Sequence, residues 1–419
     1  MPGRDQTRWS SHADQIRPSD RKPGENPAEN KEPADRLRYL GRRRGDRSVT
    51  RELPDTARST PVTASSPDGA RGGRRGRGRM TTTVVSLSVA LLLSVLAGIA
   101  LGPTVVPPGD VVHFLIAALT GGSIQAEDVT GYSIVWHVRT PRVLLAAVVG
   151  AGLSVVGVAI QALVRNALAD PFVLGISSGA SVGAAAVVVF GVFAGLGVYA
   201  ISAAAFAGAL GATVLVYLAA RGPLGLTPLR LLLTGVALTY GFQAVMSMLV
   251  FLSPNAQAAR TVLFWLLGSL GGASWQSLPL VTVSVVVSIV VLLRSSRALD
   301  VLSMGDETAA SLGVDAQALR RRLFLLTAVA TGLIVAVSGA IPFVGLILPH
   351  MLRILVGSTH RRVFVIAPLA GACFLVWVDV LARTLVPPEE LPLGVITALV
   401  GVPVFITLMR RRGYLFGGR

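Results

Sequence analysis

The chain carries a series of long apolar segments, and their length restricts the folds that it can adopt. Each segment has about 15 to 23 residues and almost no charge, which is the length of helix that crosses roughly 30 Å of lipid hydrocarbon. Lipid leaves no water to bond a free backbone, so such segments cross it as helices. The sequence therefore predicts an all-α polytopic membrane protein with about ten transmembrane helices. We place these helices near residues 82–102, 143–163, 172–193, 197–219, 230–251, 276–293, 323–340, 343–357, 363–384 and 392–409.

Composition and two shorter apolar segments fit this prediction. Hydrophobic residues make up 52% of the chain and charged residues only 14%, and the mean hydropathy is +0.65, as in membrane proteins. Residues 111–119 and 261–272 are apolar but too short to span a bilayer. We expect them to form interfacial helices outside the membrane.

Residues 1–79 differ from the rest of the chain. They hold 19 of the 38 Lys and Arg residues and 11 of the 22 Asp and Glu residues. Low hydrophobicity with dense charge of both signs predicts a disordered cytoplasmic extension, which we expect to be dispensable. Its Arg-Gly run at 71–79 could contact RNA or anionic lipid, but an unstructured tail, or a true start at Met80, is the simpler interpretation. The membrane domain is then residues 80–419.

The arginines indicate the orientation of the predicted spans. Ten spans place both termini on one side of the membrane. Fourteen arginines of the membrane part fall in loops and the tail on that side, and Arg353 falls inside a span. The opposite side holds four, namely Arg139, Arg142, Arg260 and Arg383. The positive-inside rule therefore predicts that both termini are cytoplasmic.

Residue types that bind metals or hydrolyse ATP are scarce. The chain has one cysteine, Cys373, and five histidines, none at metal-ligand spacing. A disulfide framework and a cysteine-based metal site within one chain are therefore excluded. No lysine follows Lys31, which excludes a Walker-type phosphate loop from the membrane part. We expect no catalytic residue, no metal site and no cofactor bound by this chain.

Residues 295–322 form the one sizeable polar, acid-containing segment between the apolar tracts of this part of the chain. Ser303 is a predicted N-cap, with Asp306 three residues later in a near capping-box arrangement. Asp306 and Glu307 then occupy the first turn, where the helix dipole favours negative charge. Gly313 offers a left-handed stop. The segment therefore predicts a short helix in a cytoplasmic loop.

The surface of this short helix has two interpretations. Ala309 and Leu312 would form a small apolar edge with Thr308 while the acids face away, and Gly305 would allow a close backbone approach. A partner protein that contacts this edge would make the segment a contact helix that receives force. The alternative is a cytoplasmic connector that happens to be helical.

Two further motifs place polar residues close to the predicted spans. Arg165 and Asn166 end one span on the cytoplasmic side. Asp170 and Pro171 are typical of a helix start, with Asp170 as N-cap and Pro171 in the first position.

The second of these motifs is SGAIPFVGLILPHMLR, at residues 338–353. Arginine at membrane depth is costly and usually faces a bundle interior or a cavity. Arg353 therefore either lines a transport path or bonds free carbonyls at a helix end. His350, which follows Pro349, is interpreted as a core histidine in preference to a metal ligand.

Together these motifs resemble the FecCD-type permeases, the membrane subunits of ABC importers for ferric siderophores, haem and vitamin B12. The resemblance covers about residues 82–412. Ala167 stands where the family often has proline, and residues 1–79 have no counterpart. The matching stretches are R-x-P-R, Q-x-x-x-R-N-x-L-A-D-P, L-G-x-S-x-G-A, G-D-E-x-A-x-x-L-G, G-x-I-x-F-V-G-L-x-x-P-H and E-L-P-x-G-x-x-T-A-x-x-G-x-P.

The resemblance implies the type II ABC importer permease fold and the transport of an iron(III)-siderophore-type chelate. It implies a complex with a second permease chain, identical or paralogous, and with two cytoplasmic ATP-binding subunits that use the ATP. It also implies an extracytoplasmic substrate-binding protein. The complex would lie in the plasma membrane of a bacterium. No nucleic acid is expected.

The resemblance also assigns roles to residues. The family's loop between the sixth and seventh spans docks into its ATPase, which maps to about residues 299–314 here. Family arginines that pair with the binding protein map to Arg139, Arg142 and Arg383, although Arg383 could instead pair with Asp379 at i,i+4. The implied coupling-loop residues are Ser303, Gly305, Asp306, Glu307, Ala309, Leu312 and Gly313. The implied structural or pathway residues are Gln161, Asn166, Asp170, Pro171, Gly345, Pro349, His350 and Arg353.

Three alternatives stay open at this point. Haem and cobalamin permeases share the same motifs. An ion-coupled secondary transporter would carry acids inside its spans, whereas Asp379, near an outer end, is the one acid that we place within a span. A membrane scaffold that recruits RNA or other partners has only residues 1–79 to support it.

Overall fold

The computed structural model describes residues 68–223 and 225–411. The predicted disorder of residues 1–67 therefore lies outside the described residues. The domain boundary expected at residue 80 falls inside helix α1 (Asp68–Ala100). Residues 68–79 belong to that helix, whose candidate membrane-spanning part is Gly78–Ala100.

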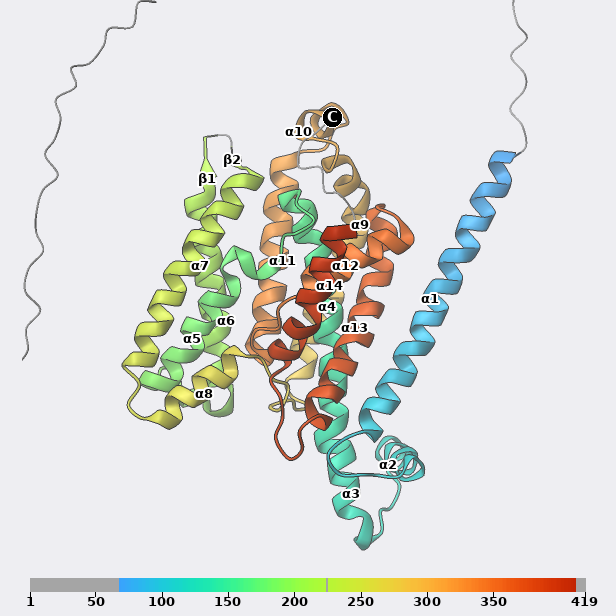
Figure 1. Ribbon diagram of the computed structural model, residues 1–419, viewed down its shortest axis with the longest axis vertical. Coiled ribbons are helices and arrows are strands. Elements are labelled where there is room, and N and C mark those ends of the chain that lie inside the picture. The colour runs from blue at the N-terminus through green and yellow to red at the C-terminus, as the bar shows by residue number, and fades with distance from the viewer. Residues whose placement is uncertain (1–67, 224, 412–419) are drawn as a thin grey trace, which may run out of the picture. The chain divides into compact units, whose positions relative to one another are not determined.

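Each of the ten predicted spans corresponds to a helix (Figure 1). By length and composition, seven helices of the described chain could cross a membrane, whereas α5, α12 and α14 are shorter apolar helices. The helices are α1, α4 (Thr140–Val164), α5 (Ile176–Phe190), α6 (Ala200–Ala220), α7 (Pro228–Phe251), α9 (Leu278–Leu302), α11 (Ala316–Ser338), α12 (Val344–Val356), α13 (His360–Thr384) and α14 (Leu393–Arg411).

Short elements connect these helices. The two short apolar segments form α2 (Pro108–Thr120) and α8 (Ala256–Leu266), and α8 ends earlier than expected. One antiparallel pairing joins α6 to α7, with Arg221 opposite Leu226. The remaining elements are η2 (Ala126–Asp128), α3 (Val129–Ser133), η3 (Ile134–Arg139), η4 (Pro171–Leu174), η5 (Ala194–Tyr199), β1 (Arg221–Gly222), β2 (Gly225–Leu226) and α10 (Asp306–Ser311).

Helix α4 is the most deeply packed of the candidate spans. In the most apolar stretch of the span Ala126–Val164, which contains α4, 78% of residues are buried, against 17% for the span in α1 and 11% for α7. It contacts α9, α11, α12 and α13, which surround it in Figure 1. Gly150 of α4 meets Gly371 of α13, and a Cβ on either residue would collide with the carbonyl oxygen of the other. Small residues thus let these backbones approach closely, as helices in lipid require.

Buried apolar side chains form two main clusters. The first includes Leu226, Leu299, Ala309 and Phe324, and so joins β2, α9, α10 and α11. The second surrounds the C-terminal end of α1 and the helix α2, with members such as Val143. The two clusters fix the two ends of the bundle, where the polar residues predicted from the sequence are found.

Candidate functional site

Helix α10 and the turns on either side of it form the predicted cytoplasmic contact segment. Ser303 is not its N-cap: α9 ends at Leu302, and the Ser303 hydroxyl donates to the carbonyl of Asp300 at 2.6 Å. The N-cap is Gly305, with a φ of +126°, which L side chains rarely adopt. A Cβ on Gly305 would have Thr308 Oγ1 as its nearest heavy atom, at 3.8 Å. The glycine is therefore needed for its backbone conformation and not for space.

Asp306, in the first turn of α10, holds the helix to the bundle. Its carboxylate accepts two hydrogen bonds from Arg320 of α11, at 2.7 and 2.5 Å. It also pairs with Arg165, the residue that ends α4 in the left-handed conformation. The expectation that this acid faces away is wrong. Two arginines, one at the end of α4 and one near the start of α11, bind this carboxylate and hold the short helix beside both.

Ala309 does not face a partner. It is fully buried and belongs to the apolar cluster that it shares with α9 and α11, so the predicted edge with Leu312 does not exist. Leu312 and Met304 are the exposed apolar side chains here, at 60% and 68% exposure. Gly313 has a φ of +77°, which confirms the left-handed stop. The surface open to a partner therefore includes the apolar side chains of Met304 and Leu312 and the acidic side chain of Glu307.

Gln161, near the end of α4, joins α12 to the centre of the bundle. Its side-chain amide donates to the carbonyl of Leu346 at 3.1 Å, and its oxygen accepts a hydrogen bond from Arg353. Arg353 also lines a cavity of about 590 Å³, together with Arg165, Asn166 and His360. The arginine bonds a side-chain amide and lines a cavity, and its role on a transport path or at a helix end stays a prediction.

Asp170 begins a helix as predicted. Its carboxylate accepts the Phe172 N–H at 2.9 Å, although the first turn is the 3-10 helix η4, and α5 starts only afterwards. Burial raises the pKa of Asp170 to about 6, against the lowering effect of the Phe172 and Phe343 backbone groups. The same carboxyl lines a second cavity of about 420 Å³, whose other wall is α7 with Thr239, Tyr240 and Gln243.

The remaining motif residues lie in or beside α12. Gly345 packs against α4, where a Cβ on Gly157 would strike its carbonyl oxygen. Pro349 is buried inside α12, and His350 is half-buried beside it. Within residues 68–223 and 225–411, no group of three or more His, Cys, Asp or Glu residues could hold a metal ion.

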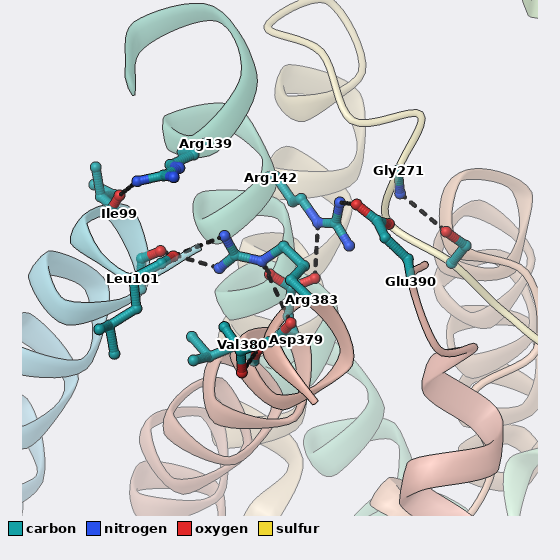
Figure 2. Close-up of polar contacts among 12 residues, drawn as sticks. Ile99, Leu101, Arg139, Arg142, Gly271, Asp379, Val380, Arg383 and Glu390 are labelled. Atoms are coloured by element: carbon teal, nitrogen blue, oxygen red, sulfur yellow. Dashed lines mark hydrogen bonds and ion pairs between the residues drawn. The ribbon is translucent and has the colours of Figure 1, made fainter. Parts of the chain in front are cut away.

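The three arginines predicted to dock a binding protein are buried inside the chain (Figure 2). Arg139, Arg142 and Arg383 are 3%, 6% and 3% exposed. Arg139 donates to the carbonyls of Ile99 and Ala100 at 3.2 and 2.9 Å. In this structure their guanidinium groups bind groups of the chain itself, and docking of a binding protein by these arginines stays a prediction.

Arg142 and Arg383 share one buried carboxylate. Asp379 is fully buried and lies 2.8 Å from Arg142 and 3.0 Å from Arg383. The i,i+4 pair is therefore present. Arg383 also donates to the carbonyls of Gly98 and Leu101, at 3.0 Å each, so it caps the C-terminal end of α1, where cations complement the helix dipole.

Arg142 also pairs with Glu390 at 2.7 Å, and the Glu390 side chain is 41% exposed. The hydrogen bond from Arg142 lowers the pKa of this carboxyl. Figure 2 shows Arg142 between Asp379 and Glu390. Glu390 is the exposed end of this network and the member that a partner outside the chain can reach.

Sequence reasoning missed three residues of these networks: Arg320, Gln317 and Glu390. Arg320 stands in a run of three arginines, and its neighbours Arg321 and Arg322 are exposed, so the run gave no sign of which member is buried. Gln317 bonds the backbone of Leu226, which lies 91 positions earlier. Glu390 belongs to the family stretch E-L-P, but only its position shows that it pairs with Arg142.

Comparison with known proteins decides the family. The family model described as the FecCD transport family matches residues 90–411. The chain belongs to the FecCD transport family. It is the permease of an ABC importer, and its apolar helices make it a multi-pass membrane protein.

Similar proteins differ in what they carry. The chain is 41% identical over 283 residues to the hemin transport system permease protein HmuU of Yersinia pestis, which covers 66% of this chain and 84% of that one. It is 40% identical over 304 residues to the vitamin B12 import system permease protein BtuC of Vibrio cholerae, covering 72% and 90%.

A solved structure supports the same fold. It is described as an inward-facing conformation of a metal-chelate type ABC transporter, and it is similar with a TM-score of 0.69 and 30% sequence identity. The match covers 79% of this chain and all of that one. The all-α ABC importer permease fold predicted from the sequence is thereby confirmed.

Proposed function

We propose that this permease imports an iron(III)-siderophore-type chelate. The observation that carries the proposal is the match of residues 90–411 to a family of chelate and corrinoid importers, together with a solved relative of the metal-chelate type. Import of haem or cobalamin is the alternative, because similar permeases carry those ligands. In each case the metal is already bound by an organic chelator, so the transport path has no need of metal ligands of its own.

The energy would come from a separate ATPase subunit that contacts the α10 segment. Met304 and Leu312 offer exposed apolar surface there, Glu307 adds a charge, and Asp306 fixes the segment to two spans. The permease itself would bind no cofactor, and ATP would be used by the partner. Two ATPase subunits and two permease chains, identical or paralogous, would form the complex, with no nucleic acid.

The distribution of arginine supports an inner face that carries α10 and both termini. The complex would lie in the plasma membrane of a bacterium. A substrate-binding protein would then dock on the opposite face, where the ends of α1 and α13 and the loop with Glu390 are found. Among the residues of the arginine network, Glu390 is the one exposed enough to take part directly.

Uptake into vesicles tests the substrate. The permease, its ATPase and its binding protein would be reconstituted and offered three ligands in parallel: an iron-55-loaded hydroxamate chelate, haemin and cobalt-57 cyanocobalamin. We expect ATP-dependent accumulation of the iron chelate alone, and vesicles without the ATPase serve as the control. Accumulation of haemin or cyanocobalamin in its place would assign the permease to the alternative ligand.

A further inference from the structure

The first turn of α11 carries two side chains that reach different parts of the molecule. Asp315 caps this turn, because its carboxylate accepts the N–H groups of Gln317 and Ala318 at 3.0 Å each. Gln317 and Arg320 are three residues apart, a spacing that makes side chains neighbours on a helix. Arg320 bonds α10, and Gln317 bonds the β-hairpin that leads into α7.

The bond toward α10 is the charged one. Arg320 is fully buried and gives two hydrogen bonds to the carboxylate of Asp306. A bidentate arginine–carboxylate pair fixes orientation as well as distance. Any displacement of α10 is therefore passed to the first turns of α11.

The bond toward α7 is neutral but closely fitted. The side-chain oxygen of Gln317 accepts the N–H of Leu226 at 2.9 Å. A Cβ on Gly225 would lie 2.6 Å from that oxygen, so the amide packs against a backbone that has no side chain at this point. Leu226 is buried in the same apolar cluster as Ala309 of α10, and α7 begins two residues later, at Pro228.

Helix α7 is the element that this bond can influence. It packs against α5, α6 and η4, but only 11% of the residues in its most apolar stretch are buried within the chain, so much of its surface is not covered by other helices of the chain. Its middle part lines the cavity of about 420 Å³ through Val236, Thr239, Tyr240 and Gln243. A change at its N-terminal end would therefore alter the wall of that cavity.

We propose that Asp306 and Gln317 are positioning residues of a relay that transmits the movement of α10, through the first turns of α11 and the hairpin at Leu226, to α7. The inference rests on the proposed function, in which an ATPase acts on α10. Contiguous contacts alone do not demonstrate coupling between sites, so the relay needs a measurement of movement at α7.

A label on α7 supplies that measurement without requiring the transported ligand. Tyr240 is 69% exposed, and Cys373 is the single cysteine, so Tyr240→Cys with Cys373→Ser gives one labelling position. An environment-sensitive fluorophore at this position would be followed in the permease–ATPase complex as ATP and vanadate are added. We expect a change in emission in this background chain.

Four variants then test the relay. Gln317→Met removes the acceptor oxygen at an exposed residue while keeping its length, and Asp306→Asn removes the charge while keeping the shape. Each should lose most of the emission change, and Gln317→Met, which lies outside the ATPase contact, should do so while ATP hydrolysis continues. Gln317→Glu keeps an acceptor oxygen and should retain the change. Arg321→Gln alters an exposed arginine of the same turn and serves as the matched control.

The double variant distinguishes a relay from two separate effects. Because both bonds belong to one chain of contacts, Gln317→Met with Asp306→Asn should lose no more of the response than either single variant. Independent, additive losses would overturn the relay, as would a full response in Gln317→Met. If the background chain itself neither binds the ATPase nor responds to ATP, the proposed function fails, and the relay fails with it.

Discussion

Replacing Asp379 by asparagine should be one of the most damaging isosteric substitutions in the chain. Asp379 is fully buried, and it is the carboxylate shared by Arg142 and Arg383, whose side chains are 7% and 3% exposed. Asparagine keeps the volume, so no cavity forms, but two buried guanidinium groups lose their common counter-ion. Removing one partner of a buried ion pair costs about 3–5 kcal/mol. We expect a loss of this size in the free energy of unfolding, measured by titration with SDS in mixed micelles.

Glu390→Gln is the matched control, since it removes a carboxylate from the same arginine at the solvent-exposed end of the network. Its side chain is 41% exposed, and an ion pair with an exposed partner contributes only about 0.2–1 kcal/mol. The two variants should therefore differ by at least ~2 kcal/mol, or roughly 30-fold in the unfolding equilibrium. Equal losses, or a negligible loss for Asp379→Asn, would refute the argument that burial decides the strength of these pairs.

Three further predictions concern the two ends of the bundle. Gly305→Ala should place roughly 1–3 kcal/mol of strain in the backbone that precedes α10 and reduce ATPase association. Gly241→Ala, at an open helical position of α7, is its control and should leave the association unchanged. Ala309→Leu should overpack a fully buried position and lower the free energy of unfolding by about 1–3 kcal/mol even without the ATPase, and an unchanged value would contradict its burial. Arg142 lowers the pKa of Glu390 below its ordinary 4.5, so the small stabilisation from this pair should be complete above pH 4.5 and be lost as pH falls through the lowered pKa. Comparing unfolding of the wild-type chain and Glu390→Gln between pH 7 and pH 3 should show the difference disappear at the acid end, and a constant difference would argue against the pairing.

The positions of the helices could be predicted because a segment that crosses lipid must bond its own backbone groups, and a helix does so. Apolar length fixed the positions of all ten helices to within a few residues at most ends, and local signals such as Asp170 and Gly313 correctly marked where helices start and stop. Helix α1 begins at Asp68, within the charged segment that precedes the first predicted span. The charge composition of a segment indicates whether it favours water, but it does not indicate where a helix begins, because a helix depends on local backbone hydrogen bonds.

The partners of the polar residues were not predictable. Topology placed Arg139, Arg142 and Arg383 at the outer side, but only the fold shows that carbonyls of α1 and the carboxylate of Asp379 bind them. The same holds for Asp306, whose arginine partners lie 141 and 14 positions away. Sequence spacing gives the side of the membrane and the face of a helix. Which side chain is buried depends on contacts between distant segments.

The central claim is that this permease is driven by ATP and not by an ion gradient. The direct measurement is uptake of the iron-55 hydroxamate chelate into vesicles that contain the permease, with its ATPase inside and its binding protein outside. The account predicts uptake that requires internal ATP and persists when ionophores collapse all ion gradients. Uptake that proceeds without the ATPase and disappears with the ionophores would contradict it.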